Sequence, residues 1–288
     1  MTSFTKNNHD CSQQNTNVSI EEFINQIPVL PSVVSEAQDI LNQASLDLDR
    51  LVKVLETDPG TVTKILRIAN SSFYGLSREI SSVRHACIVL GQYTLRNVLI
   101  TSVVISATSG NKNESKHINL LAHCIDTATI ARFLANLTGL DRDVAYLAGL
   151  LHDIGSLFID NIKPGISGLI SEKMEQDNLT RENAEKELLG FDHAEFSAEV
   201  ARYWMIPEEI AGHIQFHHCD RDGKFTMSDL INMADIISIH KDTDDFEIRG
   251  FIDDKLLIRS GLDTKKILEC VNMAKESCQT EITTLSAG

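Results

Sequence analysis

The chain of 288 residues is long enough for one large domain or two small ones, and its 42% hydrophobic content can supply a full core. Aromatic residues are sparse at 6%, and alternating runs of β-branched residues are scarce, so the composition predicts an all-α protein. The formal net charge of −15 disfavours a broad surface for phosphate backbones, which needs clustered Lys and Arg, and so disfavours direct nucleic-acid binding.

The cysteine pattern and the apolar runs bear on location. The six cysteines are scattered without Cys-x-x-Cys spacing, and the N-terminus lacks the charged and then apolar pattern of a secretory signal. Reduced thiols in the cytoplasm fit this pattern best. The most apolar run, Val98 to Ala107, is too short to span a bilayer and contains Thr101 and Ser102. We therefore expect a cytoplasmic protein without a membrane anchor.

The first residues of the chain carry little that can be buried. Residues 1–18 are rich in polar side chains, which predicts a disordered leader. Ser19, followed by Glu22 three residues later, has the spacing of a capping box and predicts a helix start. Pro28 and Pro31 then interrupt the chain.

Helical patterns with recognisable caps follow. One covers Val33 to Ala44, and either Asp47 or Asp49 could cap the next. Asp58 can cap a further helix that starts at Pro59, because proline is tolerated in a first turn.

A turn and two more helices complete the N-terminal half. The sequence NSSFYG from Asn70 to Gly75 predicts a helix C-cap and a turn. Ser82 to Leu90 and Leu95 to Ser106 predict two helices on either side of Leu90-Gly91. Together these elements predict a compact helical subdomain over residues 19–108.

The segment Ser109 to Ser115 is polar and small between two apolar segments, and predicts a boundary. Residues 116–240 form the second half, which opens with a helical pattern from Leu120 to Leu137. Residues 261–288 predict a C-terminal helix and tail, which could pack on the domain or mediate self-association.

The segment Tyr146 to Ile159, YLAGLLHDIGSLFI, predicts a buried helix that His152 and Asp153 interrupt side by side. Burying a polar pair costs free energy unless something satisfies it. An imidazole beside a carboxylate suits a divalent metal, since both supply lone pairs at neutral pH. Gly155 is expected to end or loosen the helix. In isolation, such a pair is more often a core histidine bonded to an acid.

Further histidines on apolar helices favour the metal interpretation. Asp235 lies in the middle of an apolar helix, where an unpaired carboxylate would be costly. Histidines from several helices, with carboxylates that can bridge, match the way helical scaffolds hold one or two divalent ions. His213 could lie farther out or on the surface. The predicted metal ligands are His123, His152, Asp153, His193, His217, His218 and Asp235.

Two regions of the sequence resemble the HDOD family, the HD-related output domains of bacterial signalling proteins. The first contains IPVLPSVV from Ile27, the Asp58-Pro59 helix start, KILRIANSSFYG from Lys64, ISSV from Ile80 and VLG ending at Gly91. The second contains AGLLHDIG from Ala148 and LLGFDHAEFSAEVARYWMIPEEIAGHIQFHH from Leu188 to His218. The resemblance implies one HDOD domain over residues 19–260, an HD-domain-like helical bundle with an additional N-terminal helical subdomain.

The family is similar to the HD and HD-GYP metal-dependent phosphohydrolases, so the resemblance implies that these histidines and aspartates hold iron, manganese or zinc. Two positions depart from the HD-GYP pattern. Ser156 stands where those phosphodiesterases commonly have a lysine, and Asp222-Gly223 is followed by KFTM in place of a GYP signature. These departures argue against hydrolysis of cyclic di-GMP.

The leading functional hypothesis is a bacterial regulatory HDOD module that retains a metal site and acts without catalysis. It would act through contact with signalling partners in trans or by sensing a ligand such as a nucleotide. The alternative is a metal-dependent phosphohydrolase that acts on a nucleotide or cyclic nucleotide, with a metal-bound water at His152 and Asp153. No receiver or cyclase domain fits in the chain, so its input is expected from another chain or a small molecule.

Overall fold

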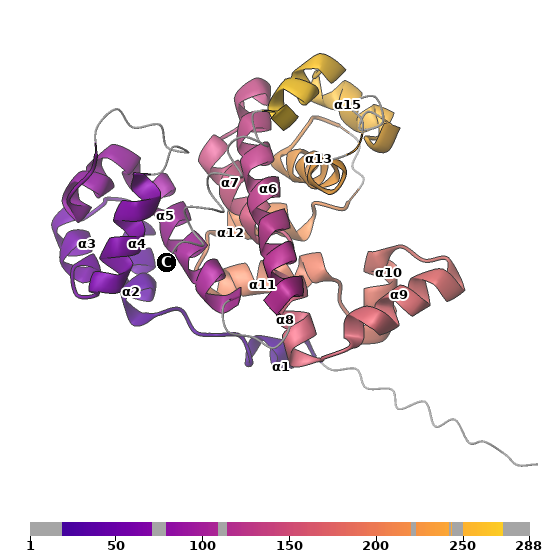
Figure 1. The fold of residues 1–288 in the computed structure, drawn as a ribbon, viewed down its shortest axis with the longest axis horizontal. Helices are drawn as coiled ribbons and strands as arrows, with labels where there is room; N and C mark the ends of the chain where they lie inside the picture. The colour runs from indigo at the N-terminus through magenta and orange to yellow at the C-terminus, as the bar shows by residue number, and fades with distance from the viewer. Residues whose placement is uncertain are drawn as a thin grey trace, which may run out of the picture.

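The computed structural model describes residues 19–70, 79–108, 114–219, 223–241, 243 and 250–272. The regular elements in these ranges are all helices, which confirms the all-α prediction. Figure 1 shows α2, α3 and α4 gathered at one side, and α6, α7 and α13 bundled beside them. The helices are α1 (Ile20–Ile24), α2 (Ser32–Leu41), α3 (Leu48–Leu55), α4 (Pro59–Ala69), α5 (Val83–Thr108), α6 (Glu114–Thr138), α7 (Arg142–Leu151), α8 (Ile154–Ile162), α9 (Ile166–Asp177), α10 (Arg181–Leu189), α11 (His193–Tyr203), α12 (Glu208–Gln215), α13 (Met227–His240) and α15 (Asp254–Ser260).

Some predicted features lie outside the described residues. They are the leader, the part of the NSSFYG turn after Asn70, residues 109–113 of the predicted boundary, Asp222, and the tail from residue 273.

Two predicted caps are found where the sequence places them. Asp47, rather than Asp49, caps α3, and Asp58 caps α4, whose first residue is Pro59. Ser19 is the N-cap of α1, but its side chain makes no cap hydrogen bond, so the predicted capping box is wrong. The Ser19 side chain interacts with the neighbouring Glu21 carboxylate instead.

The predicted helix from Val33 to Ala44 ends early, at Leu41, because the next residue is used for long-range contacts. Asn42 takes the C-cap, and its Nδ2 donates to the Met205 carbonyl at 2.9 Å. Its Oδ1 accepts from Arg96 Nη2 at 2.7 Å. One asparagine thus connects α2 to α5 and to the end of α11.

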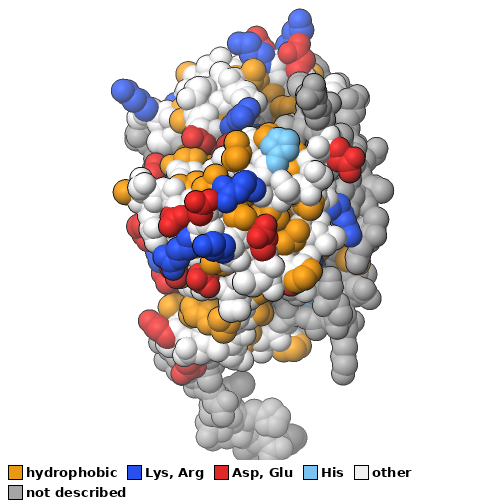
Figure 2. Space-filling model, turned by 90° about the vertical axis from the view of Figure 1, so that its left-hand side faces the viewer, with side chains coloured by type: hydrophobic (Ala, Val, Ile, Leu, Met, Phe, Trp, Pro, Cys, Tyr) orange, Lys and Arg blue, Asp and Glu red, His pale blue; other side chains and the backbone are white. Residues whose placement is uncertain are grey.

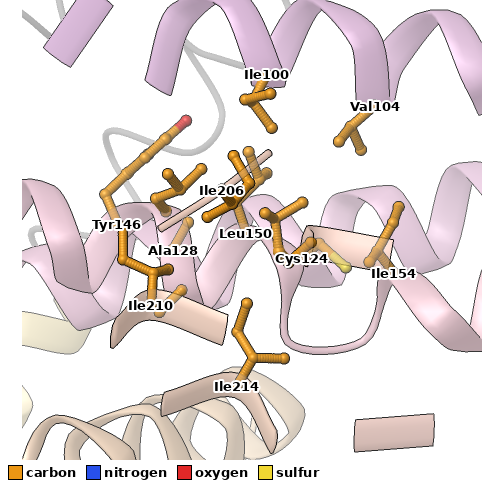
Figure 3. Close-up of a cluster of buried hydrophobic side chains, with 14 of the residues drawn as sticks. Ile100, Val104, Cys124, Ala128, Tyr146, Leu150, Ile154, Ile206, Ile210 and Ile214 are labelled. Atoms are coloured by element: carbon orange, nitrogen blue, oxygen red, sulfur yellow. The ribbon is translucent and has the colours of Figure 1, made fainter. Parts of the chain in front are cut away.

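Helix α5 joins the two halves of the chain. Gly91 has a φ of 72° and kinks the helix, so the predicted helices on either side of Leu90-Gly91 form one bent element. Beyond the kink, Ile100 and Val104 enter the core that contains Leu150 of α7 (Figure 3).

By length and composition α5 could cross a membrane, and 61% of its apolar window is buried inside the structure. This is weak support for a membrane span, because buried core helices share the same composition. Its exposed apolar side chains are Ile88, Val89 and Tyr93. Figure 2 shows a face of the N-terminal half on which basic and acidic side chains are interspersed.

The two halves share one hydrophobic core. Trp204, fully buried at the end of α11, donates from Nε1 to the Pro28 carbonyl at 3.1 Å. Its ring also packs edge-on against Phe158 of α8, with the centroids 5.9 Å apart. The end of α11 therefore contacts both the N-terminal half and the helix that follows the HD pair.

Close packing of α6 against α7 brings the predicted site together. A Cβ on Gly149 would lie 2.9 Å from the Ala128 Cα, so glycine permits an approach that a larger residue would block. The predicted helix from Leu120 to Leu137 lies within α6. At the far end of the bundle, α15 packs on α13, where Arg259 Nη2 donates to Asp229 Oδ1 at 2.7 Å.

Candidate metal centre

The HD pair lies in a break between two helices. The predicted single helix from Tyr146 to Ile159 is wrong here, because α7 ends before His152 and α8 starts after Asp153, whose φ and ψ are −112° and 9°. The backbone departs from helical geometry at Asp153, whereas His152 keeps helical φ and ψ of −54° and −38° as the C-cap of α7. Each side chain can then face residues that come from other helices.

We predicted that Gly155 would end or loosen a helix, but it lies in the first turn of α8. A Cβ there would come 2.7 Å from the His193 carbonyl oxygen and 2.8 Å from the Ser197 backbone nitrogen. The Gly155 amide also donates to Ser197 Oγ at 2.9 Å. The glycine therefore allows α8 to approach α11 closely enough to hold Asp153 beside His193.

All seven side chains predicted as metal ligands lie in one cluster. Their possible ligand atoms form three overlapping groups, and within each group the atoms lie within 4.8 Å of one another. The groups are His193, His217 and His218; His123, His152 and Asp153; and His152, His217 and Asp235. The cluster draws on α6, the α7–α8 break, α11, the turn after α12, and α13.

One side of the cluster is built around Asp235. Its Oδ1 lies 3.1 Å from His123 Nε2 and 3.5 Å from His152 Nε2. The two Nε2 atoms are 3.3 Å apart. Three atoms with metal-binding lone pairs thus converge from three segments of the chain.

The other side is built around His193. Its Nε2 lies 3.2 Å from Asp153 Oδ1 and 2.9 Å from His218 Nε2. The His217 ring packs on that of His218, with centroids 3.9 Å apart, and meets the His152 ring edge to face, with centroids 5.2 Å apart. His217 therefore lies between the two sides.

Three candidate ligand atoms at the centre of the cluster lack a well-placed hydrogen-bond partner. His217 Nε2, Asp153 Oδ1 and Asp235 Oδ1 are buried, and none of them makes a hydrogen bond of good geometry. Within the part of the chain that the structure describes, the two oxygens have only the histidine contacts given above, at 3.1 to 3.5 Å. A buried polar atom without a partner costs about 1–3 kcal/mol. One or two divalent cations held by the three overlapping groups would satisfy these atoms, so the residues present fit a metal centre.

The outward nitrogens of four histidines are already paired, which leaves each Nε2 facing the cluster. Such contacts orient imidazoles for metal binding and fix their tautomers. The pairs are His123 Nδ1 with Ser238 Oγ at 3.1 Å, His152 Nδ1 with Gly149 O at 2.8 Å, His193 Nδ1 with Glu185 Oε2 at 2.6 Å, and His217 Nδ1 with Ile214 O at 2.6 Å.

Burial and neighbouring charges set the protonation of the cluster. Burial, together with the nearby histidines, lowers the pKa of His217 well below its ordinary value, so its lone pair is free. Burial opposes a charge on His152, but Asp153 and Asp235 outweigh it and raise its pKa to about 9. Burial would raise the pKa of Asp153, yet His193 and Arg181 hold it well below the usual range. Burial likewise opposes a charge on Asp235, but contacts with His123 and His152 lower its pKa. Asp153 and Asp235 are therefore ionised, and a metal cation can replace the proton on His152.

The structure adds a residue that the sequence reasoning missed. Arg181 of α10 donates from Nη2 to Ser156 Oγ at 2.7 Å, and its Nη1 lies 3.5 Å from Asp153 Oδ2. Its Nε donates to Glu185 Oε1 at 2.8 Å. A cation from 25 residues farther along the chain therefore stands at the position where Ser156 replaces lysine. The four-residue spacing of Arg181 and Glu185 predicts an ion pair on one helix, but no local signal places that pair beside Ser156.

The family is shown by the comparison with family models. The model of the HDOD domain matches residues 27–219, which is more than half of the chain. The chain therefore belongs to the HDOD domain family, and the predicted resemblance is confirmed.

Solved structures share the fold. A candidate phosphohydrolase from Shewanella amazonensis SB2B has a TM-score of 0.75 and 24% identity, over 94% of this chain and 99% of that chain. An HDOD domain protein from Geobacter sulfurreducens has a TM-score of 0.68 and 24% identity, over 93% and 96%. At these identities the similarity shows the all-α fold alone.

A curated relative from Treponema pallidum, an uncharacterized protein, is 27% identical over 202 residues. That match spans 69% of this chain and 39% of the relative. Ribonuclease Y of Mycoplasma mycoides is 31% identical over 120 residues, which span 42% of this chain and 22% of that enzyme. The chain thus covers well under two thirds of these relatives.

Proposed function

We propose that this protein is a regulatory HDOD module that holds a divalent metal centre and signals its ligand or metal state to separate partner proteins. The observation that carries the proposal is the clustering of seven candidate ligands, in which buried atoms of His217, Asp153 and Asp235 make no hydrogen bond of good geometry. A candidate signal transduction protein from Marinobacter aquaeolei VT8 shares the fold at a TM-score of 0.65 and 22% identity, over 90% of this chain and 60% of that chain, and supports the regulatory part.

The chemistry of the donor set supports iron, manganese or zinc. Imidazole nitrogens and carboxylate oxygens are borderline and hard ligands, which suit these ions. Burial raises the pKa of the Cys124 thiol well above its ordinary value, and this neighbour of His123 belongs to none of the three groups of candidate ligands. A bound ion would supply Lewis acidity and a water of lowered pKa. The cytoplasmic location and the lack of a membrane anchor stay predictions.

A rigid connection supports the regulatory role. His193 is the first residue of α11, and Trp204 and Met205 follow its last turn. Trp204 Nε1 donates a hydrogen bond to the Pro28 carbonyl, and the Met205 carbonyl accepts one from Asn42 Nδ2. The far end of α11 therefore contacts the N-terminal half. A displacement of His193 on metal binding would therefore be carried along one helix to a distant surface.

Elemental analysis of protein purified anaerobically, without an affinity metal column, tests the metal centre. Wild type is expected to hold about one or two equivalents of iron, manganese or zinc. His152→Ala and Asp153→Ala should lose the metal, whereas His85→Ala, which changes an exposed histidine on α5, should retain it. A folded wild type that is metal-free and cannot be loaded refutes the metal centre. Pull-downs with metal-loaded and metal-stripped protein then test for partner proteins that bind only one of these two states.

A metal-dependent phosphohydrolase is the second candidate, and one observation favours it. Arg181 places a guanidinium beside Asp153 and Ser156, where it could help neutralise a phosphate. Metal-loaded protein would then hydrolyse at least one member of a panel of nucleotides and cyclic nucleotides, and Arg181→Gln would lower kcat by about 100-fold. No turnover across the panel rejects this candidate and leaves the regulatory module.

A further inference from the structure

A cavity of about 150 Å³ lies among α6, α8, α9 and α10, beside the metal centre. We call it the α8 cavity, because α8 contributes the largest share of its wall. Its apolar wall includes Leu120, Leu157 and Ile170, and its polar lining includes His117 and Asp160. Arg181 and Glu185 form the part of the lining nearest the cluster, through contacts with Asp153 and His193.

His117 is the feature that points to a ligand. Its side chain belongs to a residue that is 2% exposed, and neither Nδ1 nor Nε2 has a hydrogen-bond partner. A neutral imidazole needs one acceptor for its N–H and one donor for its bare nitrogen. Because His117 lines the cavity, a molecule there could meet one or both of these needs, and leaving them unmet costs free energy.

The charges of the lining favour a neutral ligand. Among the described lining residues, Arg181 carries the positive charge, and its guanidinium already donates hydrogen bonds to Ser156 and Glu185. Asp160 accepts from Ser167 Oγ at 2.6 Å through Oδ1, which leaves its second oxygen for a ligand donor. An inorganic anion would therefore meet a committed cation and a carboxylate. A neutral molecule with both donors and acceptors meets groups that complement it.

We propose that the α8 cavity binds a neutral nucleobase, presented as a nucleoside or nucleotide. A volume of 150 Å³ has room for about five water molecules, which suits one ring system. A flat heteroaromatic ring fits between aliphatic walls such as Leu120 and Leu157, with its polar edge toward His117 and Asp160. This inference deepens the proposed function, on which its regulatory meaning rests. The occupant would act on the metal centre through Arg181 and Glu185.

Calorimetric titration of the full chain with adenosine, guanosine, cytidine and uridine tests the cavity. These probes carry no phosphate, so they report on the cavity whether or not metal is bound. At least one nucleoside is expected to bind saturably, and His117→Phe should weaken it at least about tenfold, since Phe keeps the ring but removes both nitrogens. His85→Phe makes the same change on the exposed side of α5 and should leave binding unaltered.

A second pair of variants guards against misfolding of the His117 variant. Ser167→Trp places a large side chain at an exposed position on the cavity lining and should abolish nucleoside binding. Ser171→Trp, one turn along the same helix and also exposed, should not. Circular dichroism and thermal melting establish that each variant is folded.

Two results would overturn the cavity proposal. One is the absence of binding by all four nucleosides at millimolar concentration. The other is binding that neither His117→Phe nor Ser167→Trp alters. Metal content measured on the same samples separates the two proposals: metal without nucleoside binding rejects only the cavity, and nucleoside binding by protein that takes up no metal rejects only the metal centre.

Discussion

The two halves of the molecule treat buried charge differently. In the N-terminal half, Arg96 is 3% exposed and its guanidinium donates to Gln38 Oε1, to the Leu41 carbonyl and to Asn42 Oδ1. In the HD half, buried histidines and aspartates face one another, and His217 Nε2, Asp153 Oδ1 and Asp235 Oδ1 make no hydrogen bond of good geometry.

This difference separates a structural buried charge from one arranged for a ligand. Arg96 ties α5 to α2 and Asn42 through three hydrogen bonds to acceptors of the protein itself. The His and Asp cluster is complete only when a cation joins it, because its members cannot all bond to one another. The following predictions compare the two halves, from the largest expected effect to the smallest.

The largest expected effect is stabilisation by metal. If the cluster binds manganese, an excess of about 1,000 times Kd should raise the free energy of unfolding by about 4 kcal/mol. Urea unfolding with manganese and with a chelator measures it. His152→Ala should show no dependence on manganese, and an unchanged midpoint in wild type would contradict the prediction.

Removal of Arg96 should have the next largest effect, and should not depend on metal. Arg96→Met leaves two buried acceptors, Gln38 Oε1 and the Leu41 carbonyl, without their donor, which we expect to lower the free energy of unfolding by about 3 kcal/mol. Arg84→Met, which breaks an exposed ion pair with Asp49, is the matched control and should change it by about 0.5 kcal/mol or less. Equal losses of unfolding free energy in Arg96→Met and Arg84→Met would contradict the structural role of the buried Arg96.

Gly155→Ala should be costly because its Cβ would meet the backbone of α11. The neighbouring carbonyl oxygen of His193 lies only 2.7 Å from that Cβ, so α8 or α11 must shift. We expect a loss of about 2 kcal/mol in unfolding free energy and weaker metal binding. Gly168→Ala in α9, where a Cβ meets nothing within 4 Å, should instead be neutral or stabilising. Unfolding curves and metal titrations of both variants check this.

The smallest effect concerns reactivity rather than stability. Cys87 is buried in the N-terminal half, and burial raises its pKa to about 11. Cys219, which follows His218, is exposed. At pH 8 iodoacetamide should modify Cys219 much faster than Cys87, as followed by peptide mass spectrometry. Rapid labelling of Cys87 in the folded protein would show that the N-terminal half opens more easily than its packing indicates.

Local sequence determined most of the helices. Asp58 and Pro59 predict the start of α4 because capping and a fixed proline φ act within one turn. The same is true of the kink at Gly91, where the polypeptide adopts a positive φ that glycine favours. The capping box at Ser19 failed since a short helix offers few constraints on which neighbour a serine contacts.

The site divides in the same way. Polar residues on apolar helices marked seven candidate ligands, including His123 and Asp235, because burying such groups is costly wherever the helix packs. The structure brings those seven side chains together, and metal binding by them stays a prediction. The break at the HD pair was not visible in a periodicity that continues through it from Tyr146 to Ile159.

By itself, then, the sequence determined the helical class, the family and the residues that have metal-binding chemistry, since spacing and residue type carry that information. Only the tertiary structure decided that Arg181 meets Ser156 and that His117 faces a cavity without a partner. Those relations depend on how α6, α8 and α10 pack across long stretches of chain. Packing of helix faces sets them, and no local pattern in the sequence encodes the distance between two such faces.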